Sequence, residues 1–177
     1  MDLLKIRLLV SFIILFSLNV FANELITTYT KDFKNLSKEQ IEVAKAIYHK
    51  AKVYDLGYTA AAIAWQESNL GMYPVNLQDP SCGPFHINIK TYTTRYKIPK
   101  GNFNFNKACS LLISDLDVSL TAFLAEIEAW KVVHRKKTNL WEYVYRSYNA
   151  GYNFESNRAI NYSNQIKARI KVLMKHL

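Results

Sequence analysis

The chain contains 177 residues, carries a formal net charge of +9 at pH 7 and is 50% hydrophobic. That length is typical of one domain, and the apolar fraction is enough to bury a core, which argues against a chain too polar to fold. The sequence shows no internal repeat, linker or low-complexity tract, so we expect one domain without repeats.

The first 22 residues have the form of a secretory signal peptide. Lys5 and Arg7 precede an apolar run over residues 8–21, and the run ends in small residues before a cleavage point after Ala22. This run is shorter than the roughly 20 residues that a membrane-spanning helix needs. We therefore expect an exported protein, in the periplasm, the cell envelope or the medium, whose mature domain is residues 23–177.

Cleavage would remove Lys5, Arg7 and Asp2 and so lower the net charge of +9 by one, to +8. A basic surface attracts polyanions of any kind. For an exported protein the expected polyanion is peptidoglycan or an anionic membrane rather than nucleic acid. Charge alone does not choose between these two partners.

Two cysteines, Cys82 and Cys109, are present. In an oxidising compartment such a pair indicates one disulfide, which would close a loop of about 27 residues and stabilise the fold by about 3 kcal/mol. The alternative is a nucleophilic Cys82 near His86, but proximity in sequence does not supply the geometry that a thiol enzyme needs. The four histidines lack the spacing of metal ligands, so no metal and no cofactor are predicted.

Apolar periodicity predicts a mostly helical domain. Ser37 and Gln40 form a capping box at the start of a helix over residues 38–54. No periodicity is evident over residues 23–36. Further helical patterns cover residues 91–97, residues 107–133 with Asp115 or Asp117 capping a second segment, residues 139–151 and residues 161–177. The basic stretch 134–137 is expected to be solvated at a helix end.

A helix over residues 59–71 carries the first candidate for catalysis. Ala60, Ile63, Ala64 and Glu67 share one face of this helix. Asn69 and Gly71 are expected to end it. A carboxyl that ends an apolar stripe is poorly hydrated, which is the environment of a general acid that works near neutral pH. The alternative is a glutamate that points into solvent.

The segment over residues 71–90 contains prolines and glycines that exclude a continuous helix. Phe85, Ile87 and Ile89 alternate with polar residues, as in a short strand or an extended loop. We expect this segment to fold over Glu67 as one wall of a cleft. A hairpin that only covers the core is the alternative.

Residues 66–69 (Gln-Glu-Ser-Asn), 81–88 (Ser-Cys-Gly-Pro-Phe-His-Ile-Asn) and 147–151 (Ser-Tyr-Asn-Ala-Gly) resemble three motifs of the soluble lytic transglycosylases. In these goose-lysozyme-like, peptidoglycan-cleaving enzymes the motifs run Glu-Ser, Gly-Leu-Met-Gln and Ala-Tyr-Asn-Ala-Gly, in this order. Asn161-Tyr162 is a weaker match to a further family tyrosine. The resemblance implies an all-α or α+β lysozyme-like fold, a helical bundle with a short β-hairpin or loop wall after the catalytic helix.

The resemblance also implies a mechanism. Glu67 would protonate the glycosidic oxygen between MurNAc and GlcNAc, and then accept the proton of the MurNAc C6 hydroxyl as a 1,6-anhydro ring closes. One carboxylate then suffices where most glycosidases need a pair. Asp79 is the candidate second acid if water is the nucleophile instead. Tyr148 is implied as the second catalytic residue, with its hydroxyl directed toward Glu67.

The residues implied to contact substrate lie mostly in the motifs: Ser68, Ser81, Gly83, Phe85, His86, Ile87, Asn88, Asn149 and Tyr162. The chain departs from the family at residues 83–86, where the family has Leu, Met and Gln. Phe85 is expected to replace Met as an apolar wall. His86 keeps a hydrogen-bonding side chain but adds a titratable group, so some pH sensitivity is expected.

A structural role remains the alternative for three of the candidate site residues. Tyr148 could be a core residue, Asn149 a helix cap, and Ser68 could bond to its own helix. The expected function is that of a monomeric lytic transglycosylase acting on glycan strands. Three alternatives stay open, of which the first two are a hydrolytic muramidase and a non-catalytic peptidoglycan-binding component of a secretion or conjugation apparatus. A basic protein that acts on membranes or nucleic acid through charge is the third.

Overall fold

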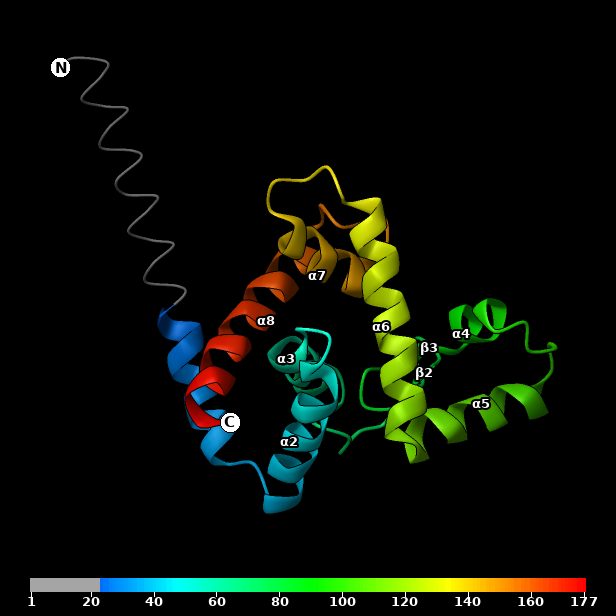
Figure 1. The fold of residues 1–177 in the computed structure, drawn as a ribbon, viewed down its shortest axis with the longest axis horizontal. Coiled ribbons are helices and arrows are strands. Elements are labelled where there is room, and N and C mark those ends of the chain that lie inside the picture. The colour runs from blue at the N-terminus through cyan, green and yellow to red at the C-terminus, as the bar shows by residue number, and fades with distance from the viewer. Residues whose placement is uncertain (1–22) are drawn as a thin grey trace, which may run out of the picture.

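The computed structural model describes residues 23–177 (Figure 1). The expected signal peptide lies outside the described residues. Helix accounts for 70% and strand for 4% of the structure, so the expectation of a mostly helical domain with a small β element is confirmed, and the architecture is compatible with an all-α or α+β fold.

The elements follow one another as a helix over residues 23–34, α2 (Lys38–Lys52), α3 (Gly57–Ser68), the strands β1 (Val75–Asn76), β2 (Ser81–Cys82) and β3 (Ile87–Asn88), and then α4 (Ile89–Arg95), α5 (Asn102–Ser114), α6 (Leu116–Val133), α7 (Leu140–Ala150) and α8 (Asn157–His176). The strands form one antiparallel sheet with β2 in the middle. In its register Cys82 lies opposite both Val75 and Ile87.

Side-chain caps set several of these boundaries. The Ser37–Gln40 capping box is present at the start of α2, as predicted. Asp115, rather than Asp117, caps α6 by accepting hydrogen bonds from two backbone N–H groups. The last helix begins four residues earlier than expected, because the side chain of Ser156 accepts the N–H of Ala159 and caps it there.

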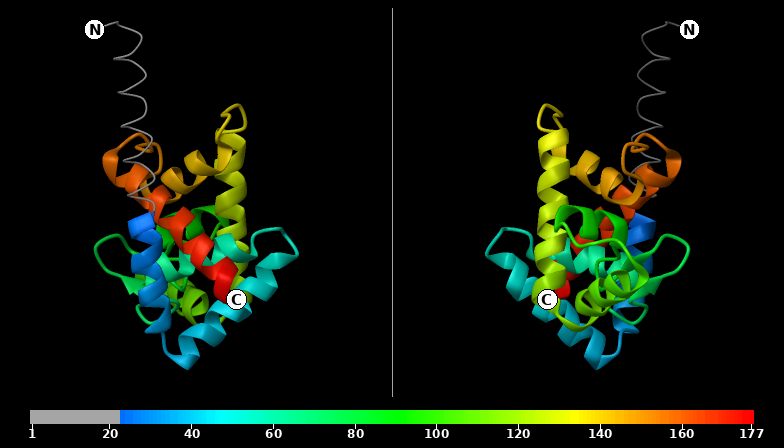
Figure 2. Two further views of the ribbon diagram at one scale, coloured as in Figure 1. Left: turned by 90° about the vertical axis from the view of Figure 1, so that its left-hand side faces the viewer. Right: turned by 90° about the vertical axis from the view of Figure 1, so that its right-hand side faces the viewer.

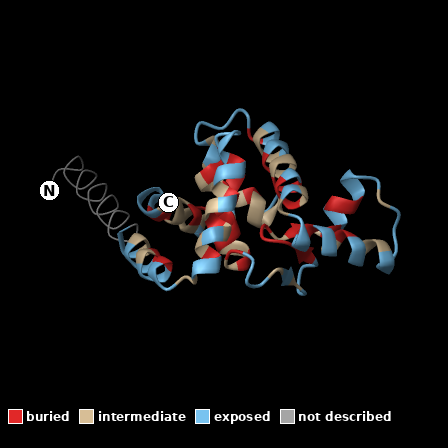
Figure 3. Ribbon diagram, turned by 60° about the horizontal axis from the view of Figure 1, so that its bottom comes forward, coloured by how far each residue is buried: buried red, intermediate tan, exposed pale blue. Residues whose placement is uncertain are grey.

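The core is organised around α3, which packs against α2 and α8 (Figure 1). Residues 60–65 of this helix are all buried, and four of the six are alanine, so the neighbouring helices approach its backbone closely. In Figure 3 the buried residues gather where helices face one another, and exposed residues cover the outer faces. A helix buried on all sides is a rigid support for the side chain in its last turn.

Residues 23–34 are helical, although their sequence showed no periodicity. Two aromatic rings, Tyr29 and Phe33, hold this helix in place by meeting the buried Trp65 of α3 edge to face, at centroid distances of 6.0 and 5.7 Å. Phe33 also stacks on His176 at the end of α8, and the two helices lie side by side (Figure 2). Tertiary contacts therefore form this helix where local pattern did not predict it.

The sheet, α4 and α5 lie on one side of α6, and α7, α8 and α3 lie on the other (Figure 1). Cys82 and Cys109 form the predicted disulfide, with their Cα atoms 5.3 Å apart, and it joins β2 to α5. Taken singly, no helix among residues 23–177 is long and apolar enough to span a membrane. Only α5 and α6 together pass that test, and the chain bends by 102° between them.

Removing the disulfide should destabilise the protein without unfolding it. We expect Cys82→Ala/Cys109→Ala to lower the free energy of unfolding by about 3 kcal/mol, because the unfolded chain regains the entropy of the loop between the cysteines. Urea denaturation followed by circular dichroism measures the change. Wild-type protein treated with a thiol reductant should match the variant, and unchanged midpoints in both would contradict the prediction.

Candidate active site

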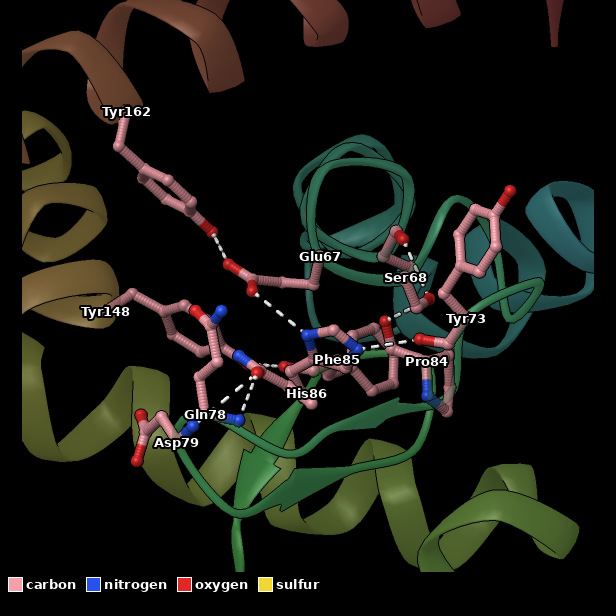
Figure 4. A network of polar contacts seen from close by, with 12 residues as sticks. Glu67, Ser68, Tyr73, Gln78, Asp79, Pro84, Phe85, His86, Tyr148 and Tyr162 are labelled. Atoms are coloured by element: carbon pink, nitrogen blue, oxygen red, sulfur yellow. Dashed lines mark hydrogen bonds and ion pairs between the residues drawn. The ribbon is translucent and has the colours of Figure 1, made fainter. Parts of the chain in front are cut away.

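Glu67 lies in the last turn of α3, where the left-handed conformation of Asn69 (φ 52°) ends the helix. Its side chain is 18% exposed, so it lies neither in open solvent nor in the sealed core. Oε1 accepts a hydrogen bond from the hydroxyl of Tyr162 at 2.5 Å, and Oε2 lies 3.5 Å from Nδ1 of His86 (Figure 4). Two partners from distant parts of the chain therefore fix the carboxyl.

Of the two candidate tyrosines, Tyr162 and not Tyr148 forms the hydrogen bond with Glu67. Tyr148, on α7, donates its hydroxyl hydrogen bond to the carbonyl of Phe85 at 2.7 Å and not to Glu67. Tyr162, expected only to bind sugar, reaches Glu67 from α8. Burial, followed by the charge of Glu67, raises the pKa of both phenols well above the ordinary value. Both hydroxyls therefore remain protonated and act as donors.

His86 comes from the loop between β2 and β3, and its backbone adopts a positive φ of 46°. Nε2 lies 2.8 Å from the carbonyl oxygen of Tyr73, and the side chain is 11% exposed. Burial alone would lower the pKa of His86, but the hydrogen bonds to Glu67 and to the Tyr73 carbonyl, with the charge of Glu67, outweigh burial and raise it. The imidazole is thus coupled to the candidate acid.

Ser68 is fully buried and does not face a ligand, contrary to the expectation of a sugar contact. Its Oγ lies 3.1 Å from the carbonyl of Ala64, the bond to its own helix, and 2.8 Å from the carbonyl of Pro84. It also accepts the N–H of Gly71 at 2.8 Å. Ser68 therefore joins the end of α3 to the loop that carries His86.

Four other expected sugar contacts, Ser81, Gly83, Phe85 and Ile87, are buried and pack within the protein. Phe85 stacks on Phe123 of α6 at 4.5 Å instead of forming an apolar wall for substrate. Gly83 has a φ of +81°, and a Cβ there would come within 2.4 Å of the Leu112 carbonyl oxygen. These four residues shape the loop from within, and Ile87 also lines the hollow beside His86. That they contact sugar stays a prediction.

The two asparagines of the motifs have different surroundings. Asn88 caps α4 by accepting the N–H of Thr91 at 3.0 Å, and it donates to Oδ1 of Asp79 at 3.0 Å. Asn149, near the end of α7, has a buried Oδ1 with no hydrogen-bond partner among the described residues. Asn149 is also not the cap of α7, which was the alternative to sugar binding. The cap residue is Gly151, whose backbone N–H donates to the carbonyl of Ser147.

Two hollows adjoin at the contact between Glu67 and His86. One, of about 430 Å³, is lined by Glu67, Tyr73, Gln66, Asn69, Asp32 and Arg169 among others. The other, of about 90 Å³, is lined by His86, Asn88, Asp79, Arg95, Glu126 and Tyr148 among others. Glu67 and His86 therefore lie between two hollows, one on either side of their contact.

Asp32 lines the same hollow as Glu67, and two other carboxylates near the site are engaged elsewhere. Glu126 pairs with Arg95 at 2.9 Å, and Asp79 accepts from Asn88. Neither forms a hydrogen bond with Glu67 within residues 23–177.

The Tyr73 carbonyl and the Arg95–Glu126 pair were not identified from the sequence, because a backbone acceptor and a pairing between separate helices leave no local pattern. In the part of the chain that the structure describes, no three His, Cys, Asp or Glu side chains are grouped to hold a metal ion.

Comparison with known proteins adds no relative. A scan of the chain against protein-family models gives no match, and searches of curated proteins and of solved structures give no significant match either.

The basic stretch after α6 begins with a buried histidine, not a solvated one. His134 is 3% exposed, and its Nε2 lies 2.7 Å from Oγ of Ser147. Burial, with a smaller contribution from Lys137, lowers the pKa of His134. The folded protein therefore keeps this imidazole neutral, at a pH where the unfolded chain already takes up a proton.

This histidine should make the fold sensitive to acid. Because the pKa of His134 is lower in the folded state, its contribution to stability is lost as pH falls through the unfolded value of about 6.5. We expect wild type to lose more stability than His134→Gln between pH 7.5 and pH 5, as measured by urea denaturation. Other titrating groups, His86 included, are common to both proteins and cancel. Equal losses would contradict the prediction.

Proposed function

We propose that the protein is a lytic transglycosylase that cleaves the bond between MurNAc and GlcNAc in peptidoglycan. The observation that carries this proposal is the carboxyl of Glu67, fixed by the Tyr162 hydroxyl at the edge of an open hollow. A single, oriented carboxyl with no second carboxylate bonded to it suits a reaction in which one group acts first as acid and then as base. The resemblance of three sequence motifs supports the same assignment.

In the first step the protonated carboxyl of Glu67 gives its proton to the glycosidic oxygen, and the bond from that oxygen to C1 of MurNAc breaks. In the second step the Glu67 carboxylate takes the proton of the C6 hydroxyl while O6 bonds to C1. The products are a free GlcNAc hydroxyl and a 1,6-anhydro ring, and no water is consumed. The Tyr162 hydroxyl, which stays protonated, holds Oε1 throughout and so limits the directions in which the carboxyl can turn.

A hydrolytic muramidase is the second candidate. It is favoured by Asp79, which lines the hollow on the His86 side and would place a second carboxylate near an attacking water. The product decides between the two: hydrolysis leaves a reducing MurNAc end, which is heavier by one water than the anhydro end. A non-catalytic module of an envelope apparatus would leave the glycan uncut.

Replacing Glu67 should remove the activity. We expect Glu67→Gln to reduce muropeptide release by about 10²-fold or more, since an amide can neither give nor take the proton. Mass spectrometry of digested peptidoglycan measures both the rate and the anhydro end. The matched control is Glu128→Gln, because Glu128 is a solvent-exposed carboxylate whose ion-pair partner within residues 23–177 is Lys131. Undiminished release by Glu67→Gln would rule out Glu67 as the acid.

Substitution of Tyr162 should affect mainly kcat, and substitution of Tyr148 should affect mainly the melting temperature. Tyr162→Phe removes a hydrogen bond to a carboxylate, which typically contributes about 1.5–3 kcal/mol, so we expect kcat to fall by about 10- to 100-fold with little change in melting temperature. Tyr148→Phe leaves the Phe85 carbonyl without its donor and should lower the melting temperature more than Tyr162→Phe does. Steady-state kinetics and calorimetry on both variants make the comparison. The reverse pattern would contradict these assignments.

A further inference from the structure

The two ring nitrogens of His86 face two different oxygen acceptors. Nε2 lies 2.8 Å from the carbonyl oxygen of Tyr73, and a carbonyl only accepts, so Nε2 carries a hydrogen in every protonation state. A neutral imidazole has a single N–H, so Nδ1 of the neutral ring presents a lone pair to Oε2 of Glu67, 3.5 Å away. Two lone pairs in contact repel, and one proton between them removes the repulsion.

We propose that Glu67 and His86 hold one proton between them and that His86 is the positioning residue that keeps this proton at the active carboxyl. The proposal rests on the proposed function, because it assigns the source of the proton that Glu67 delivers. The proton resides either on Nδ1, beside a carboxylate, or on Oε2, beside a neutral ring. In both arrangements the pair as a whole is neutral.

The pair accounts for both halves of the reaction. When the O–H bond of Glu67 breaks and the glycosidic oxygen gains the proton, the new carboxylate faces the bare lone pair of Nδ1. The pair then lacks the proton that separates its two lone pairs, and it regains one from the C6 hydroxyl as O6 closes on C1. One proton leaves the pair and one returns, and no co-reactant is needed.

The charges around the pair favour keeping the proton. The titratable and charged groups that face His86 are Glu67 of α3, Asp79 between β1 and β2, Arg95 of α4, Glu126 of α6 and Tyr148 of α7, and those on the Glu67 side are Asp32 of the first helix, Tyr73, and Tyr162 and Arg169 of α8. Arg95 and Glu126 neutralise one another at 2.9 Å, and the tyrosines stay neutral. Arg169 and Asp32 carry opposite charges on the Glu67 side. The charge that acts on the ring is that of Glu67, and it stabilises a protonated imidazole.

The loop fixes the ring in this orientation. The backbone N–H of His86 donates to the carbonyl of Gly83 at 3.1 Å, in a turn where the φ of His86 is 46°. Positive φ is uncommon for residues other than glycine and costs free energy, and it occurs often at functional sites. Both ring nitrogens and the backbone N–H of His86 therefore have partners, so the side chain faces Glu67 in one fixed rotamer.

Two variants distinguish proton sharing from a role of His86 in hydrogen bonding and packing alone. In His86→Asn the amide nitrogen takes the place of Nδ1, keeps a donor to Glu67 and tolerates positive φ, but it cannot titrate. In His86→Gln the amide takes the place of Nε2 and keeps the bond to Tyr73. We expect the alkaline limb of the kcat/KM profile to lie above pH 6.5 in wild type and to move down by about one pH unit or more in both variants. A uniform loss of activity at every pH would overturn the proposal.

The titration of His86 itself is measured by ¹⁵N NMR of its ring nitrogens, assigned by their absence in His86→Asn. We expect the wild-type midpoint to lie above 6.5 and to fall by about one pH unit in Glu67→Gln, with no change in Glu128→Gln. An unchanged midpoint in Glu67→Gln overturns proton sharing whether or not the protein cleaves glycan. A shifted midpoint in a protein that leaves glycan uncut supports the pair and defeats the proposed function instead.

Discussion

The hydroxyl of Ser68 is the contact on which the geometry of the site depends. It is fully buried, accepts from Gly71 and lies within hydrogen-bond distance of the Pro84 carbonyl. Because Ser68 follows Glu67 directly and Pro84 is two residues before His86, one side chain fixes the separation between the carboxyl and the imidazole. In a water-excluded position such a bond is costly to break, since it leaves polar groups unpaired. The relative positions of Glu67 and His86 are therefore set by the fold before any ligand arrives.

The loop that carries His86 is a packed wall and not a mobile cover. The disulfide joins β2 to α5, Gly83 presses against the Leu112 carbonyl, and Phe85 stacks on Phe123. Each contact comes from a different neighbour, so no single one carries the loop. With the loop fixed on its inner side, its outer side can hold His86 in a costly backbone conformation.

Periodicity and capping predicted most of the helices and the place of Glu67, because both signals are local. Local signals could not assign the partner of Glu67: Tyr148 and Tyr162 both lie on predicted helices, and only the packing of α7 and α8 against α3 decides which hydroxyl reaches the carboxyl. The helix over residues 23–34 was missed for a related reason, since its evidence is the contact of two aromatic rings with Trp65. The burial of His134 could not be predicted either, because the residue begins a basic stretch of the kind that is usually solvated at a helix end.

The motif over residues 81–88 therefore has a different meaning from the one its resemblance first suggested. Most of its side chains point inward, so matching this motif is evidence for the shape of a wall more than for contacts with sugar. Within it, His86 is the residue whose side chain contacts Glu67, and it is also where the chain departs from the family it resembles. Gln at this position would offer hydrogen bonds of fixed protonation. In the proposed mechanism a histidine at this position joins Glu67 in a pair that shares a proton, so the departure would change the chemistry of the site while the wall around it keeps its shape.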